Sequence, residues 1–166
     1  MEKEFLSEEK IIKEIDAYID RVKTTFRIAK TVIEALKTFQ GKPPNQFQRI
    51  EKAVKKALPD YTVRYHRDYG NYRLIIWGNG VDYQNSVNML IARDHETSLQ
   101  IQSVIEHNHY LLNETRINEL EAKKLALPEA VSKFNQGLAL IKEAQKIAEG
   151  HLDHYLYPLS KLFQLT

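Results

Sequence analysis

The chain has 166 residues and a net charge of +2, with 43% hydrophobic residues, 28% charged residues and no cysteine. This balance predicts one folded domain over residues 1–166 and excludes a disordered chain, while the short apolar runs exclude a membrane span. The absence of cysteine excludes disulfides, zinc–thiolate sites and thiol nucleophiles. The charged start, MEKEFLSEEK, lacks the apolar core of a signal peptide, so we expect a cytoplasmic protein.

The first predicted element is a long helix within residues 1–41. Ser7 is the expected N-cap, and Gly41, which precedes two prolines, marks the expected end. Between them the apolar residues are separated by alternating gaps of three and four, which is typical of a heptad seam. The seam consists of Ile12, Ile15, Ile19, Val22, Phe26, Ala29, Ile33 and Leu36. A second apolar row lies beside it, so we expect this helix to pack against more than one neighbour.

Residues 42–94 are expected to hold a short helix and a small sheet. Asn45 and Gln48 fit a capping box for a helix that ends before Pro59. Beyond this helix the apolar period changes to two, which indicates strands. The predicted strands cover residues 61–66, 72–77 and 87–93, and the first two form a hairpin. The third strand is apolar on both faces, which places it inside the sheet or under a helix.

Residues 95–166 are expected to form two long helices and an apolar tail. Asp94 is the predicted N-cap of a helix from about Glu96 to Leu127, and Pro128 opens the last helix as a first-turn proline. The short connection predicts an antiparallel helical hairpin. Asn113 falls among the apolar positions, which indicates a bend or a polar contact near it.

Together these elements predict a predominantly helical α+β fold in the order α-α-β-β-β-α-α. The expected assembly is a long-helix bundle with a small three-stranded antiparallel sheet. From the second helix onward, residues 45–112 resemble the helix, three strands, helix order of double-stranded-RNA-binding domains. That family carries a Lys-Lys cluster at the start of the helix after the third strand, whereas the matching stretch here, residues 94–97, reads Asp-His-Glu-Thr. The resemblance therefore implies a topology and not an RNA-binding function.

The positive charge is concentrated in residues 42–73, which carry eight basic and three acidic side chains, a net charge of +5. Aromatic residues alternate with these cations, as on surfaces that contact phosphates, stack bases or anchor a protein partner. The predicted binding residues are Arg49, Lys52, Lys55, Lys56, Arg64, His66, Arg67, Tyr69 and Arg73. The alternative is that the tyrosines pack under the short helix while the lysines only solvate its outer face.

Patterns for catalysis are weak in this chain. His151 and His154 are three apart on a predicted helix, but their spacing identifies no third zinc ligand. The segment 78–80, Gly-Asn-Gly, predicts a sheet turn, because a phosphate-binding loop needs more glycines and a following helix. We therefore predict a protein that is not an enzyme, with no catalytic residues, no cofactor and no metal, and keep a histidine-metal enzyme as an alternative.

The leading hypothesis is a non-enzymatic binding protein that docks a macromolecular partner through the basic, tyrosine-rich helix and hairpin. Phages and mobile elements use small cysteine-free chains to inhibit bacterial defence nucleases, and we include that role among the expectations. The second hypothesis is direct nucleic-acid binding by the same segment. We expect a protein or nucleic-acid partner and no membrane, with a homodimer formed through the heptad helices.

Overall fold

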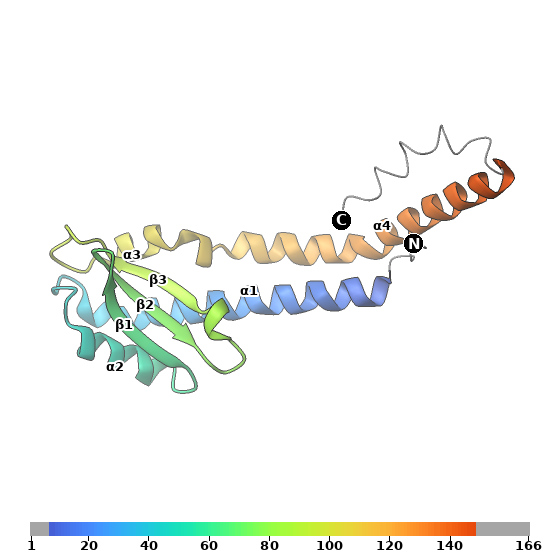
Figure 1. The fold of residues 1–166 in the computed structure, drawn as a ribbon. Coiled ribbons are helices and arrows are strands. Elements are labelled where there is room, and N and C mark those ends of the chain that lie inside the picture. The colour runs from blue at the N-terminus through green and yellow to red at the C-terminus, as the bar shows by residue number, and fades with distance from the viewer. Residues whose placement is uncertain (1–6, 149–166) are drawn as a thin grey trace. The chain divides into compact units, whose positions relative to one another are not determined.

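A computed structural model of the chain describes residues 7–148. Within this range the helices and strands are α1 (Glu8–Leu36), α2 (Phe47–Ala57), β1 (Thr62–Asp68), β2 (Asn71–Trp77), β3 (Val87–Ala92), α3 (Ile101–His107) and α4 (Glu114–Ala148) (Figure 1). Three short 3-10 helices join them: η1 (Lys37–Phe39), η2 (Tyr83–Asn85) and η3 (His109–Leu111). The predicted α+β class and the predicted order of elements are confirmed.

The described chain divides into two compact units, and each is considered by itself. The first unit, residues 17–120, contains the C-terminal part of α1, α2, the sheet, α3 and the start of α4. The second unit is described over residues 7–16 and 121–148. In this second unit Lys124 on α4 forms an ion pair with Asp16 on α1. The expectation of one domain stays a prediction.

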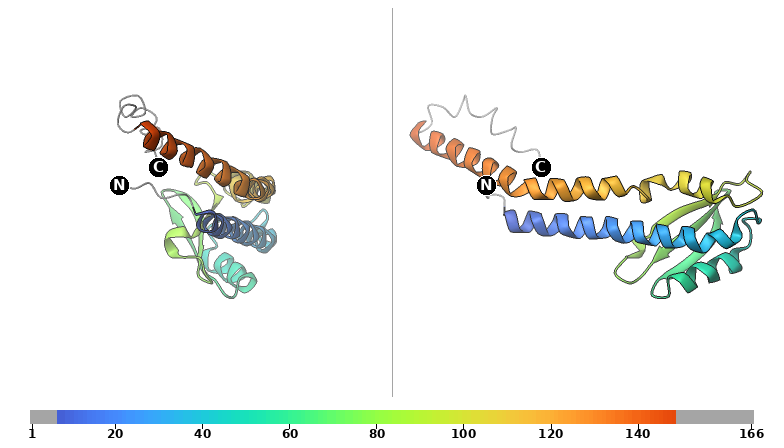
Figure 2. Two further views of the ribbon diagram at one scale, coloured as in Figure 1. Left: turned by 90° about the vertical axis from the view of Figure 1, so that its right-hand side faces the viewer. Right: turned by 180° about the vertical axis from the view of Figure 1, so that it is seen from behind.

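The sheet of the first unit is antiparallel, and its strand order is β1-β2-β3 within the described chain. β1 and β2 form a hairpin in which Asp68 pairs with Asn71, so the predicted five-residue turn is only two residues long. All three strands lie within two residues of their predicted ranges. Figure 2 shows α1, α2 and α3 on one side of this sheet, which makes a two-layer arrangement in the first unit.

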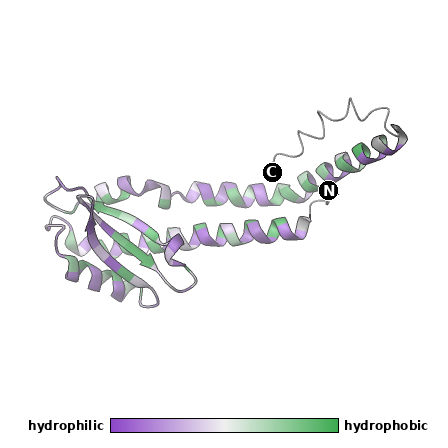
Figure 3. Cartoon of the chain, viewed as in Figure 1, coloured by the Kyte–Doolittle hydropathy of each residue, from purple (hydrophilic) through white to green (hydrophobic). Residues whose placement is uncertain are grey.

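The core of the first unit lies between the helices and the inner face of the sheet. Its fully buried side chains include Ile28, Val32, Leu36, Ile50, Val54, Leu74, Ile76, Met89 and Val104. Complete burial of an aliphatic side chain of this size contributes about 1.5–3 kcal/mol. The C-terminal half of the α1 heptad seam is therefore used inside its own unit. Figure 3 shows hydrophilic colour over most of α2 and long hydrophobic stretches in β2 and β3.

The predicted caps are confirmed for α1 and wrong for α2. The backbone N–H of Lys10 donates to Ser7 Oγ at 3.4 Å, as expected of an N-cap. At the other end, η1 closes the helix and Gly41 takes a φ of +74°, a conformation that favours glycine. In α2 the N-cap is Gln46, which makes no side-chain capping bond, so the capping box of Asn45 and Gln48 does not form.

The segment after β3 also differs from its prediction. Asp94 does not cap a helix, because α3 begins only at Ile101, with Gln100 as its N-cap. The long helix expected from Glu96 is interrupted after α3, and α4 begins at Glu114. The backbone N–H of Arg116 donates to Asn113 Oδ1 at 3.1 Å, so this asparagine caps α4. The polar contact predicted near Asn113 is therefore present, as the cap of a separate helix.

The predicted hairpin between Leu127 and Pro128 is wrong, because α4 runs through Pro128 without interruption. A proline inside a helix removes one hydrogen bond and bends the helix. The residues on both sides are mostly strong helix formers, and no glycine ends the helix there. Figure 1 shows α4 changing direction in its orange part. His151, His154 and the predicted apolar tail lie outside the described residues.

Candidate binding surface

The outer face of the sheet is the side that carries no α-helix in the described chain (Figure 2). Val63 pairs with Ile76 and Tyr65 pairs with Leu74, and all four are buried in the core. Because side chains alternate along a strand, the intervening residues point the other way. We call these residues the open sheet face: Thr62, Arg64, His66, Asp68, Asn71, Arg73, Ile75, Trp77, Asn88 and Leu90.

The open sheet face combines positive charge with an apolar centre. On the middle strand Arg73 lies between His66 and Leu90, and its Nη1 donates to Asn88 Oδ1 at 3.3 Å. The next outward residue, Ile75, lies between Arg64 and Asn88. Arg64 and Asn88 are exposed, while the aliphatic side chains of Ile75 and Leu90 are partly exposed. This face therefore presents guanidinium groups beside apolar surface that stays partly exposed in the described chain.

Aromatic side chains lie at one end of this face. The Trp77 ring is 5.1 Å from the ring of Tyr83, centroid to centroid, and the two rings are nearly perpendicular, a favourable edge-to-face geometry. Trp77 is partly exposed, and Tyr83, on η2, is 59% exposed. The Gly78-Asn79-Gly80 segment beside them forms the predicted sheet turn, closed by two backbone hydrogen bonds between Gly78 and Val81.

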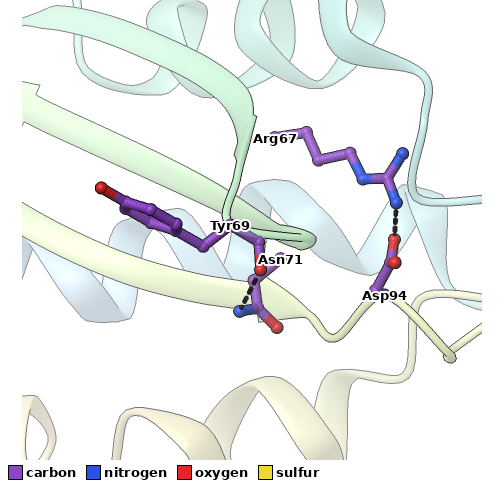
Figure 4. A network of polar contacts seen from close by, with 4 residues as sticks. All are labelled: Arg67, Tyr69, Asn71 and Asp94. Carbon is purple, nitrogen blue, oxygen red and sulfur yellow. Dashed lines mark hydrogen bonds and ion pairs between the residues drawn. The ribbon is translucent and has the colours of Figure 1, made fainter.

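The opposite end of the hairpin carries Tyr69 in an unfavourable backbone conformation. Tyr69 and Gly70 form the two-residue turn with φ values of 45° and 81°. A turn with two left-handed residues suits Asn-Gly, and a bulky residue at its first position costs about 1 kcal/mol. The Tyr69 side chain is 97% exposed (Figure 4), so its ring gains no packing in return. This combination marks Tyr69 as a candidate contact residue.

Arg67 belongs to a different surface from its neighbours Arg64 and His66. It lies on the inner side of β1, at the end of the sheet, with its guanidinium carbon 6.0 Å from the centre of the Tyr72 ring. It also forms an ion pair with Asp94, the residue predicted to cap a helix (Figure 4). Arg67 therefore connects the hairpin to the segment after β3.

The four cations of α2 lie in the helical layer and not on the open sheet face. These are Arg49, Lys52, Lys55 and Lys56, all exposed. Lys55 Nζ donates to the backbone carbonyls of Pro59, at 3.0 Å, and Tyr61. Glu51, on the same helix, accepts a hydrogen bond from the backbone N–H of Tyr65 at 2.9 Å and so covers part of the β1 edge.

The structure thus brings together only part of the predicted site. Arg64, His66 and Arg73 share the open sheet face, and Tyr69 extends from the adjoining turn. Sequence reasoning did not include Ile75, Asn88 and Leu90 in the site, and it left Trp77 at the margin. The signal was present in the unbroken apolar run from residue 74 to residue 77, because a strand that is apolar on both sides needs a contact on each of them.

The tyrosines of the inner face pack under α2, as the alternative interpretation expected. Phe47, Tyr65 and Tyr72 form a cluster with ring centroids 5.4 to 6.5 Å apart. The Tyr65 hydroxyl donates to the carbonyl of Pro44 at 2.7 Å. Burial, together with the nearby Tyr72, raises the pKa of Tyr65 above its usual range. Tyr65 belongs to the core, and Phe47 and Tyr72 pack against it with part of their surface exposed.

The part of the chain that the structure describes shows neither a cluster of metal ligands nor a helix suited to span a membrane. In residues 7–148 no three His, Asp or Glu side chains are grouped as ligands for a metal ion. None of the described helices is both long enough and apolar enough to cross a lipid bilayer. Comparison with protein-family models, with curated proteins and with solved structures finds no match for this chain.

Proposed function

We propose that this protein is a non-enzymatic binding protein whose contact surface is the open sheet face together with Tyr69. The observation that carries the proposal is the set of partly exposed apolar side chains, Ile75, Trp77 and Leu90, on a sheet face that no α-helix of residues 7–148 covers. Exposed apolar groups bordered by polar residues are typical of interaction sites.

The two groups of cations differ in a way that supports this choice of surface. Interfaces are enriched in arginine, tyrosine and tryptophan and depleted in lysine and glutamate. The open sheet face and its hairpin tip carry Arg64, Arg73, Trp77 and Tyr69 and no lysine. The exposed cations of α2 are mostly lysines, whose strongly hydrated ammonium groups suit a surface that stays in water. We therefore assign the contact to the sheet and not to α2.

Nucleic-acid binding is the second candidate function of the same surface. It is supported by the position of Trp77 and Tyr83 on the side of the sheet that carries Arg64 and Arg73, since aromatic rings stack bases and cations contact phosphates. The partly exposed Ile75 in the middle of the face offers no ring for stacking. For this reason a protein partner is the first proposal. The narrower expectation of a nuclease inhibitor stays a prediction.

Photo-crosslinking tests which surface makes the contact. Benzoylphenylalanine replaces Tyr69, Ile75 or, as a control on α2, Lys52, and each full-length variant is irradiated in lysate of the source organism with and without nuclease. We expect the same crosslinked species from positions 69 and 75 and none from position 52. Equal crosslinking from all three positions, or crosslinking from position 52 alone, would contradict the proposed surface. Loss of the species after nuclease treatment would favour the second candidate.

A further inference from the structure

We propose that the partner presents an acidic protein segment, in which carboxylates flank a projecting apolar side chain. This inference rests on the proposed function, because it describes what binds the open sheet face. It is argued from the charges of that face, from its apolar centre and from the geometry of the hairpin tip.

The first step is charge complementarity. The open sheet face carries Arg64, His66 and Arg73 and a single acidic residue, Asp68, which lies at its hairpin end. Arg64 and Arg73 form no ion pair with any residue in the range 7–148. They lie diagonally across neighbouring strands, which brings like charges close together. Carboxylates from a partner would relieve this repulsion and can accept two parallel hydrogen bonds from each guanidinium group.

The second step is the apolar centre of the face. Ile75, on the middle strand, is next to Arg64 and Asn88, and Leu90 lies beside Arg73. An aliphatic surface bordered by guanidinium groups matches a protein side chain surrounded by carboxylates, because the apolar contact excludes water around the ion pairs. A phosphate backbone laid over the same aliphatic groups would lose hydration without a compensating contact.

The third step is the position of Tyr69. This residue extends from the turn at one end of the hairpin, and its side chain is directed away from the Arg67–Asp94 ion pair (Figure 4). Its left-handed backbone has φ of 45°. A tyrosine in that position adds a large, rigid contact beside the face while leaving the charged residues free. We therefore expect Tyr69 to contact the partner at the edge of the acidic segment.

The probe is a displayed library of random 16-residue peptides, selected on the immobilised full-length protein and counter-selected on the Arg64→Glu/Arg73→Glu double variant. The control variant, Lys52→Glu/Lys56→Glu, makes the same change in net charge on α2. Circular dichroism and urea unfolding establish that both variants fold. Enriched peptides are then measured by fluorescence anisotropy, alongside a 20-residue single strand of deoxythymidylate.

We expect enriched peptides with Asp or Glu on both sides of an apolar residue. Their affinity should fall about tenfold or more on Arg64→Glu/Arg73→Glu and less than about twofold on Lys52→Glu/Lys56→Glu. Replacing the peptide carboxylates by lysine should restore binding to the double variant.

Four outcomes would overturn the inference. Peptides that need the open sheet face but carry no acidic residues would leave the proposed function in place and remove the acidic partner. Absence of enrichment would overturn it, and so would enriched peptides that both variants weaken equally. The fourth outcome is tight, steeply salt-dependent binding of the single strand that is lost on Arg64→Glu/Arg73→Glu, which would assign the face to nucleic acid. The crosslinking experiment tests the proposed function separately, because it compares crosslinking from positions 69, 75 and 52 and does not depend on the charge of the partner.

Discussion

The side-chain amide of Asn108 pairs with both backbone polar groups of Leu90. The Leu90 N–H donates to Asn108 Oδ1 at 2.9 Å, and Asn108 Nδ2 donates to the Leu90 carbonyl at 2.7 Å. The same Nδ2 also donates to the carbonyl of Val104 at 2.7 Å. Asn108 thus occupies part of the free edge of β3 as a neighbouring strand would, and it is fully buried.

Replacing Asn108 by Leu should destabilise the first unit by about 2–4 kcal/mol, because buried backbone groups lose their partners. Urea unfolding monitored by Trp77 fluorescence measures this loss. The control is Asn118→Ala on the exposed surface of α4, for which we expect a change within about 0.5 kcal/mol. Similar stabilities for the two variants would contradict the role assigned to Asn108.

Replacing Tyr69 by Asn should stabilise the protein by about 0.5–1 kcal/mol, because asparagine tolerates the left-handed conformation of this turn. Tyr69→Ala should bring no such gain, since alanine lacks the short polar side chain whose local hydrogen bonds let asparagine tolerate this conformation. Thermal unfolding compares the variants with Tyr83→Asn, an exposed tyrosine that lies outside the left-handed region. If Tyr69→Asn lowered stability, the ring would have a structural role. A gain in stability together with weaker partner binding is the expected pair of results.

Stability should fall in alkaline solution because Tyr65 is buried and neutral. Its pKa is raised in the folded protein, so its contribution is complete below the unfolded value of about 10 and decreases as the pH rises above that value. Tyr65→Phe should remove this part of the pH dependence and cost about 1 kcal/mol at neutral pH through the lost bond to Pro44. Urea unfolding at neutral and alkaline pH tests both effects, and an unchanged alkaline slope in Tyr65→Phe would refute the assignment.

Replacing Pro128 by Ala should stabilise α4 by about 1–3 kcal/mol, because alanine restores a backbone donor inside the helix. The matched control is Ala126→Gly, an exposed position two residues earlier, which should cost about 1 kcal/mol. Far-ultraviolet circular dichroism during thermal unfolding follows both changes. A loss of stability in Pro128→Ala would show that the helix depends on its bend.

Local patterns in the sequence predicted most of the elements. Ser7 and Gly41 lie at the ends of the first helix because an N-cap oxygen and a left-handed C-terminal residue act within a few residues of themselves. The alternation in residues 61–66 predicted the first strand because its two faces contact different environments, and the apolar run in residues 74–77 lies in the second strand. By the same alternation, Arg64 and His66 share a face.

The predictions that were wrong came from helix-boundary motifs whose residues can also serve in other local structures. Asp94 is a good helix cap by composition, but in the folded chain its carboxylate pairs with Arg67. Asn45 and Gln48 have the spacing of a capping box, but α2 begins without one. Pro128 is a common first-turn residue, yet the helix formers around it carry α4 through that position. In each case the local motif was compatible with more than one structure.

The sequence by itself determined the class and order of the elements, and that positive charge gathers between residues 42 and 73. Only the tertiary structure decided which of those charges lie together. α2 packs its apolar residues against the inner face of the sheet, so its lysines remain in the helical layer, while strand pairing places Arg73 opposite His66 on the open sheet face. The physical reason is that a charge pattern is local to the chain, whereas a surface depends on which apolar face each element buries.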